Sequence, residues 1–196
     1  MKVAIVKYNA GNVASVRNAL SRLGVADPVV SDDVDVLRRA DRVIFPGVGE
    51  ASTAMRYLRE RGLDDVIRSL TQPVLGVCLG MQLLCATSEE NDTECLGIFP
   101  NRVKRFESDG SLKVPHMGWN RISNLRSEIF NNLPDGSYVY FVHGYYVEPS
   151  DEAAATSEYG VEFASAIARD NFYAVQFHAE KSGAVGQRIL ENFLKL

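Results

Sequence analysis

The stretch VLGVCLGMQ (residues 74–82) decides the fold of this chain. An apolar run leads to Cys78, a helical pattern follows it, and Gly76 and Gly80 stand two residues to either side. A strand that passes through a tight turn into a helix is a unit of a parallel sheet covered by helices. Glycine allows close backbone packing at such a turn because it has no Cβ. The stretch therefore predicts an α/β fold with Cys78 at the carboxyl end of a strand.

Strand and helix signals alternate on both sides of this stretch. Apolar runs predict strands at residues 3–8, 28–30, 42–47 and 73–77, and apolar spacings of three and four predict helices at 12–24, 34–40, 52–70 and 79–86. Residues 96–176 carry short strands and turns, which favour antiparallel additions, and residues 183–196 form an amphipathic helix. We expect a single open, mostly parallel twisted sheet flanked by helices, with added antiparallel strands. Without repeats or a linker, residues 1–196 are expected to form one domain.

The composition excludes several classes of function. Of the 196 residues, 46% are hydrophobic and 23% are charged, as in globular proteins. The net charge of −4 argues against a nucleic-acid partner, and no apolar stretch is long enough to span a membrane. The first residues predict a strand rather than a signal peptide. Three cysteines and three scattered histidines favour a cytoplasmic protein with no disulfide framework, no metal site and no cofactor.

Cys78 is the first candidate for catalysis. In a parallel sheet, ligands bind at the carboxyl ends of the strands, and a strand-to-helix turn lifts a side chain into that space. The following helix favours the thiolate, and the backbone N–H of Leu79 can donate to an oxyanion. The alternative is a small buried residue with packing glycines. Cys85 and Cys95 lack such flanks and are expected to be structural.

A nucleophilic cysteine needs a base and a group that orients the base. In QFHAEKS (residues 176–182), His178 and Glu180 are two residues apart, so on an extended segment both point to one side. The alternative is a surface ion pair or a capping glutamate. His116 and His143 are weaker candidates for the base because neither has a carboxylate at that spacing.

The stretch FPGVGEAS (residues 45–52) ends another strand at the same edge of the sheet. Backbone N–H groups around Gly47, Val48 and Gly49 can face a developing oxyanion. The alternative is an ordinary turn between a strand and a helix.

Together these segments resemble a known family. GVCLGMQ, PGVG and QFHAEKS, in this order, are similar to the class I, or triad, glutamine amidotransferases. NAGNVASV (residues 9–16), FPGVG and PHMGWN (residues 115–120) resemble more specifically the glutaminase subunits of imidazole glycerol phosphate synthases of histidine biosynthesis. The resemblance covers essentially the whole chain.

The resemblance implies a role for each motif. Cys78 attacks the side-chain amide of glutamine and forms a glutamyl thioester, His178 transfers protons, and Glu180 orients His178. The N–H of Leu79 and one N–H from Gly47–Gly49 form the oxyanion hole. The amino-acid end of glutamine is held by Gln82, His143, Gly144 and Tyr145.

The resemblance also implies a partner. Ammonia passes through a channel to a (β/α)₈ cyclase subunit in a heterodimer, which makes imidazole glycerol phosphate and an aminoimidazole carboxamide ribotide. The residues expected at the partner interface are Asn12, Trp119, Asn120, Tyr138 and Lys181. For Trp119 the alternative is a core residue.

Two positions depart from the family pattern. Ala179 stands where the family usually has proline between histidine and glutamate, and Asn9 stands where a smaller residue is more common. Three other interpretations stay open: a glutaminase for another synthase, such as one making anthranilate, guanylate or pyridoxal phosphate; a related cysteine peptidase or chaperone; and a catalytically silent binding module.

Overall fold

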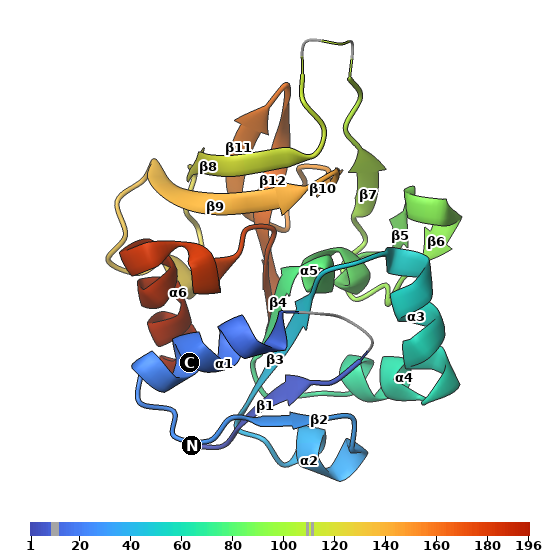
Figure 1. Ribbon diagram of the computed structural model, residues 1–196, viewed down its shortest axis with the longest axis vertical. Helices are drawn as coiled ribbons and strands as arrows, with labels where there is room; N and C mark the ends of the chain where they lie inside the picture. Colours follow the sequence, from blue (N-terminus) through green and yellow to red (C-terminus); the bar gives the residue numbers. More distant parts are fainter. Residues whose placement is uncertain (9–11, 109, 111) are drawn as a thin grey trace.

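The computed structural model describes residues 1–8, 12–108, 110 and 112–196. Its main sheet begins with parallel strands in the order β2-β1-β3-β4-β13. Their bounds are Val29–Ser31, Val3–Val6, Arg42–Gly47, Val74–Cys78 and Phe172–Val175. The carboxyl ends of β1, β3 and β4 point toward the upper part of the molecule in Figure 1. The expected parallel core is confirmed.

Antiparallel strands extend this sheet beyond β13. The continuing order is β12-β10-β7-β5-β6, and β11 pairs with β12. These strands are β12 (Val161–Arg169), β10 (Tyr145–Val147), β7 (Arg102–Arg105), β5 (Thr87–Ser88), β6 (Thr93–Glu94) and β11 (Ala153–Tyr159). A separate antiparallel pair, β8 (His116–Ile122) and β9 (Ser137–His143), lies across the top of the parallel strands (Figure 1). The predicted antiparallel additions are therefore present.

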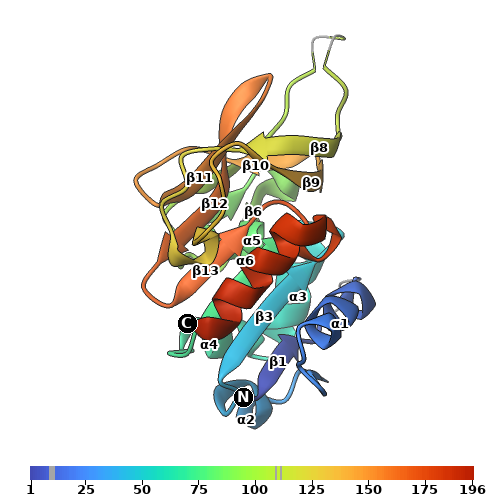
Figure 2. The same cartoon turned by 90° about the vertical axis from the view of Figure 1, so that its left-hand side faces the viewer.

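Helices cover both faces of the sheet. On one face lie α1 (Val13–Arg22), α6 (Gly183–Lys195) and the short 3₁₀ helix η2 (Glu128–Phe130), with α1 and α6 side by side in both Figure 1 and Figure 2. The other face carries α2 (Val34–Arg38), α3 (Ala51–Glu60), α4 (Leu63–Arg68) and α5 (Leu79–Leu84). Two further 3₁₀ helices are η1 (Glu90–Asp92) and η3 (Ala179–Lys181).

Strand β1 shows why the sequence chooses this arrangement. Its four residues are all buried, and they divide between the two apolar cores: Ala4 faces the core under α3 and α4, and Ile5 faces the core under α1 and α6. Side chains of a strand alternate between the faces of the sheet, so a strand covered on both sides must be apolar throughout. The uninterrupted apolar run in the sequence is the signature of this double cover.

The turn that carries Cys78 is built on close backbone packing. A Cβ on Gly80 would lie 1.9 Å from the carbonyl oxygen of Phe45, and one on Gly76 would lie 2.8 Å from a methyl group of Leu84. Cys78 itself has φ 55° and ψ −112°. For a residue other than glycine, this backbone conformation costs about 1–3 kcal/mol of conformational free energy. It persists only where the surrounding structure holds the residue in it. The two glycines let α5 pack closely against β3 and β4, and this packing holds the turn in place.

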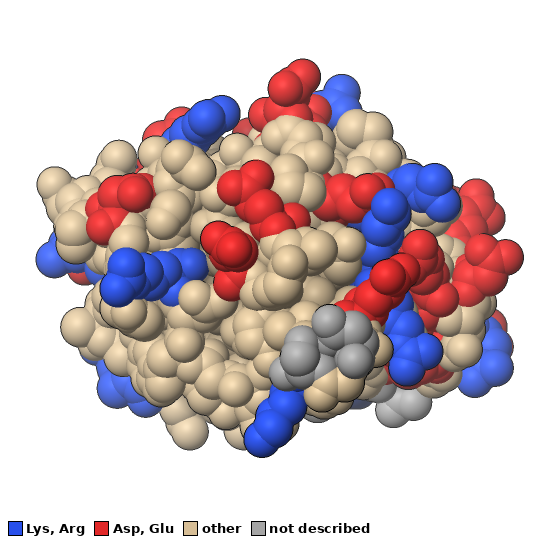
Figure 3. Space-filling model, turned by 90° about the horizontal axis from the view of Figure 1, so that it is seen from above, with Lys and Arg blue, Asp and Glu red and all other residues tan. Residues whose placement is uncertain are grey.

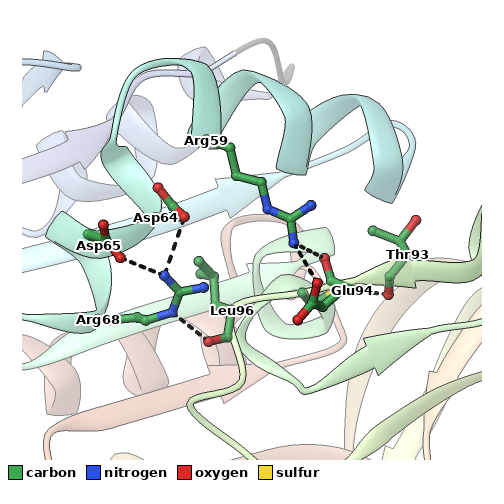
Figure 4. A network of polar contacts seen from close by, with 8 residues as sticks. Arg59, Asp64, Asp65, Arg68, Thr93, Glu94 and Leu96 are labelled. Atoms are coloured by element: carbon green, nitrogen blue, oxygen red, sulfur yellow. Dashed lines mark hydrogen bonds and ion pairs between the residues drawn. The ribbon is translucent and has the colours of Figure 1, made fainter.

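Two arginines tie α3 and α4 to the segment that follows η1 (Figure 4). The Nε atom of Arg68 donates to the carbonyl oxygen of Leu96 at 2.8 Å, and Nη1 lies 2.9 Å from Asp65 Oδ1. Arg59 Nη2 donates to the carbonyl oxygen of Glu94 at 2.9 Å. Bonds from guanidinium groups to backbone carbonyls fix a segment that has little regular structure of its own. These bonds hold the backbone at residues 94–96, which directly follows η1, against α3 and α4.

The surface carries charges of both signs. Lys and Arg alternate with Asp and Glu over the face drawn in Figure 3, and no continuous basic band crosses that face. Among the described residues, none of the helices has the length and apolar character needed to cross a bilayer.

Candidate active site

A cleft of about 330 Å³ opens beside the carboxyl ends of β3 and β4. It is bounded by the turn after β4, the loop after β3, the end of β9 and the segment that leads into α6. Its lining residues are Val48, Gly49, Cys78, Leu79, Gln82, Glu90, Pro115, Val142, His143, Gly144, Tyr145, His178 and Lys181. Segments far apart in the sequence therefore converge on the cysteine that the turn presents.

Cys78, His178 and Glu180 form a continuous set. Cys78 and His178 line the same cleft, the neighbouring Cys78 raises the pKa of His178, and Nδ1 of His178 lies 2.8 Å from Oε1 of Glu180. The side chains of His178 and Glu180 are 3% and 1% exposed. The pairing is as predicted, but the local geometry is not: Glu180 lies in the 3₁₀ helix η3 rather than on an extended segment. The tight helical turn brings the carboxylate back to the imidazole.

The charge state of His178 follows from its neighbours. Burial opposes a charged imidazole, but the neighbouring Cys78 and Glu180 outweigh it and raise the pKa of His178 to about 9. His178 is therefore protonated near neutral pH and can act as a proton donor in the cleft.

Asn12, which is expected at the partner interface, also contacts Glu180. Its amide Nδ2 donates to Oε1 of Glu180, the oxygen that also accepts from His178. The residue is half-buried at the start of α1, with a left-handed φ of 75°. Its side chain thus helps to orient the carboxylate of Glu180, and its expected place at the partner interface stays a prediction. The neighbouring Asn9, named above as a departure from the family pattern, lies outside the described residues.

The loop after β3 lies against the turn that carries Cys78. Gly47 pairs with Cys78 across the two strands, and Val48 and Gly49 line the cleft together with Leu79. The hydroxyl of Tyr8 donates to the carbonyl oxygen of Pro46 at 2.6 Å and fills the space that a Cβ on Gly47 would need. This packing fixes the loop beside Cys78 at the edge of the cleft.

The other predicted substrate residues also reach the cleft. Gln82 projects from α5, and His143, Gly144 and Tyr145 pass along the opposite side. His143 is buried and bonds the carbonyl oxygen of Tyr145 at 2.7 Å through Nδ1. Burial lowers the pKa of His143 to about 3, so its imidazole is neutral near pH 7.

The chain is similar in sequence to known proteins along almost its whole length. The class-I glutamine amidotransferase family matches residues 4–196. This chain belongs to that family. Among curated relatives, it is 57% identical to a protein of Bacteroides fragilis, 54% identical to one of Bacteroides thetaiotaomicron and 46% identical to one of Yersinia pseudotuberculosis. Each match covers 100% of this chain and 100% of the relative, and each relative is called imidazole glycerol phosphate synthase subunit HisH.

Solved structures agree on the fold of this amidotransferase. A structure from Thermoplasma acidophilum, described as part of a putative GMP synthase, superposes with a TM-score of 0.77 at 23% identity, covering 100% of this chain and 93% of that one. A second structure, described as a glutamine amidotransferase, gives a TM-score of 0.75 at 19% identity, covering 98% and 97%. At these identities the likeness establishes the fold class.

The structure adds a residue that the sequence analysis of this amidotransferase missed. Glu90, at the start of η1, lines the cleft and accepts a hydrogen bond from the backbone N–H of Ala51 at 2.7 Å. Burial raises the pKa of its carboxyl group. Nothing in the acidic run around Glu90 separates it from its neighbours, so only the fold distinguishes it. A carboxylate at this place suits the ammonium group of an amino acid.

The remaining interface candidates of the amidotransferase lie on its outside. Trp119 and Tyr138 are 55% and 48% exposed on the β8–β9 pair, so the core alternative for Trp119 is wrong. Asn120 is half-buried and donates to the carbonyl oxygen of Glu158, and Lys181 is exposed at the rim of the cleft. Cys85 and Cys95 are buried, and burial raises the pKa of both thiols. Across the described ranges, no three acidic, cysteine or histidine side chains gather as metal ligands would.

Proposed function

We propose that this chain hydrolyses L-glutamine to L-glutamate and ammonia, with Cys78 as the nucleophile, and delivers the ammonia to a cyclase subunit of imidazole glycerol phosphate synthase. The observation that carries the proposal is the Cys78–His178–Glu180 set at the wall of the cleft. Full-length relatives named as subunits of that synthase support the assignment to histidine biosynthesis.

The chemistry follows from the order of the three side chains. The thiolate of Cys78 attacks the carboxamide carbon of glutamine, and the oxyanion lies between Leu79 and the Gly47–Gly49 loop. His178 gives its proton to the nitrogen as the C–N bond breaks, so ammonia leaves and a thioester remains. Water then attacks the thioester carbon, His178 takes its proton, and the C–S bond breaks to release glutamate. Glu180 keeps the imidazole in place through both steps.

Recognition of the amino-acid end uses the opposite wall of the cleft. Glu90 supplies a negative charge for the α-ammonium group, and the side-chain oxygen of Gln82 supplies a further acceptor, because its nitrogen already donates to Tyr145 and Gln176. We expect Glu90→Gln to raise KM for glutamine by about tenfold with a smaller change in kcat, since one charge-assisted contact is lost. An unchanged KM would remove Glu90 from the substrate site.

The partner, a (β/α)₈ cyclase subunit in a heterodimer, docks on the outer face of β8 and β9. Met117, Trp119 and Tyr138 are the large apolar side chains exposed there, 64%, 55% and 48% respectively. Exposed aromatic residues and methionine are typical of the centre of protein interfaces. Lys181 stands at the rim of the cleft beside this face and completes the proposed contact surface.

The decisive experiment measures ammonia release from glutamine. The chain is assayed alone, with the cyclase subunit, and with the cyclase subunit plus its nucleotide ligand, each beside Cys78→Ala. The proposal expects activity that rises with the liganded partner and is absent from Cys78→Ala. Trp119→Ala is expected to weaken the response to the partner while leaving the partner-free rate unchanged.

The alternative of a silent binding module has its own test. A glutamine-mimicking alkylator should label Cys78 and leave Cys85 and Cys95 unmodified, because burial keeps those two as thiols. No labelling of Cys78, together with normal binding of the cyclase subunit, would favour the silent module.

The proposed function also includes a single domain and a location in the cytoplasm. Both apolar cores share the main sheet, so we treat residues 1–196 as one amidotransferase domain. The three cysteines are all free, which fits the reducing environment of the cytoplasm.

A further inference from the structure

The carbonyl oxygen of Tyr145 is a fixed acceptor beneath the cleft. It accepts from Nε2 of Gln82 at 3.0 Å and from Nδ1 of His143 at 2.7 Å. A carbonyl oxygen cannot donate, so the nitrogen end of the Gln82 amide and a protonated Nδ1 of His143 must face it. One backbone atom thereby sets the orientation of two side chains.

The orientation of Gln82 passes to a second buried amide. The same Nε2 of Gln82 donates to Oε1 of Gln176 at 3.0 Å. Gln176 must therefore turn its own Nε2 the other way, and that atom lies 3.8 Å from the sulfur of Cys78. Gln176 is 0% exposed and Gln82 is 5% exposed, so water does not compete for these contacts. This orientation of Gln176 turns a hydrogen-bond donor toward the sulfur, and the carbonyl oxygen of Val142 also lies 3.8 Å from the same sulfur.

Hydrogen bonds from the far side hold the same carbonyl. Because Nδ1 of His143 carries the hydrogen, its Nε2 must accept, and it lies 2.9 Å from Nδ1 of His116. Nε2 of His116 in turn lies 3.5 Å from Nδ2 of Asn120. The Tyr145 carbonyl is thus fixed both from the cleft and from the strand β8.

We propose that Gln176 is a further catalytic residue, whose amide N–H donates to the sulfur of Cys78, and that Gln82 and the Tyr145 carbonyl position this donor. A donor at the sulfur stabilises the thiolate and fixes its direction of attack, as charge-assisted hydrogen bonds do elsewhere. His178 lines the same cleft as the sulfur, and Gln176 reaches the sulfur from a fully buried position. The inference rests on Cys78 being the nucleophile of the proposed function.

The test uses a reaction that needs neither glutamine nor the partner. Iodoacetamide alkylation of Cys78 is followed by mass spectrometry from pH 5 to pH 10, because the rate reports the thiolate directly. Gln176→Met removes the donor at nearly constant size, and Gln176→Glu keeps an acceptor for Gln82 but replaces the donor with a second acceptor. Both variants should move the pH midpoint of alkylation upward and slow the reaction at pH 7 by about tenfold or more, with the larger effect in Gln176→Glu.

Ser165→Ala is the matched control. Ser165 is buried, its carbonyl oxygen accepts from the Gln176 backbone N–H at 2.9 Å, and among the described residues its hydroxyl has no hydrogen-bond partner. Its alkylation profile should match that of the unsubstituted chain. The other titratable groups around Cys78 are His178 and Tyr8, which contribute to its electrostatic surroundings, and His143, Glu90 and Lys181, which line the same cleft. All five are unchanged in the three variants.

Two results would overturn the inference. One is a variant of Gln176 that keeps its thermal midpoint and alkylates like the unsubstituted chain across the whole pH range. The other is an equal shift in Ser165→Ala, which would indicate general loosening of the core. Alkylation without ammonia release in the unsubstituted chain would instead count against the proposed function, so the two failures are distinguishable.

Discussion

The Nδ1 atom of His116 lies 2.9 Å from the Nε2 atom of His143, and both residues are buried. Tyr159 stacks on His116 with ring centroids 3.9 Å apart. Burial lowers the pKa of His116 to about 4 and that of His143 to about 3. The two histidines are therefore neutral in the folded chain at pH values where an unfolded chain would protonate them.

This pair makes stability fall in acid. With an unfolded pKa near 6.5, the unfolded state binds more protons than the folded state as pH drops from about 6.5 toward 4, so the free energy of unfolding decreases across that window. His116→Gln should flatten this decrease, because glutamine does not titrate. Urea unfolding at pH 7.5, 6 and 5 measures it, and identical pH slopes for the two proteins would contradict the assignment.

Glu180 sets the alkaline limit of catalysis. Burial would lower the pKa of His178, but Cys78 and Glu180 raise it to about 9, so His178 can act as a proton donor up to that pH. The kcat for glutamine hydrolysis should fall above about pH 9. Glu180→Gln should move this fall to lower pH as well as reduce kcat. A pH profile of kcat with unchanged alkaline limit in Glu180→Gln would show that Glu180 does not control His178.

Asn12 orients Glu180 and should matter for turnover. Because Asn12→Ala removes a hydrogen bond to a buried carboxylate, we expect kcat to fall by about tenfold while KM changes little. Asn124→Ala is the control, since Asn124 is exposed and bonds Thr156 away from the cleft. Steady-state kinetics of glutamine hydrolysis without the partner decides the point. A defect seen only with the partner present would assign Asn12 to the docking surface alone.

Ala179→Pro should be tolerated. His178, the residue before it, is extended at φ −86° and ψ 92°, which is the region that residues preceding proline adopt. A cavity of about 190 Å³ borders Ala179 and leaves room for the ring. Ammonia release and thermal midpoint should stay near those of the unsubstituted chain. A large loss of activity would show that the backbone at η3 cannot accept proline, and Ala179→Ser would then separate ring size from loss of alanine.

Local patterns predicted much of the fold. The strand at residues 42–47 has the same bounds as β3, whereas the helix predicted over residues 52–70 is divided into α3 and α4, with Gly62 at the start of α4. Glycines on either side of Cys78 predicted a close-packed turn, and the structure has carbonyl oxygens and methyl groups where their Cβ atoms would lie. Short-range sterics and hydrophobic periodicity decide such features, and both are visible in a sequence.

The sequence by itself determined which residues have the chemistry: a cysteine between glycines, a histidine and a glutamate near the end of the chain, and the motifs that carry the family resemblance. Only the tertiary structure decided how they are supported. Glu90 enters the cleft, Asn12 turns inward to Glu180, and Gln176 faces the sulfur of Cys78. These placements depend on hydrogen bonds between residues many positions apart, and a buried polar group must find its partner wherever the fold brings one. The spacing of residues along the sequence therefore does not predict which partners these side chains find.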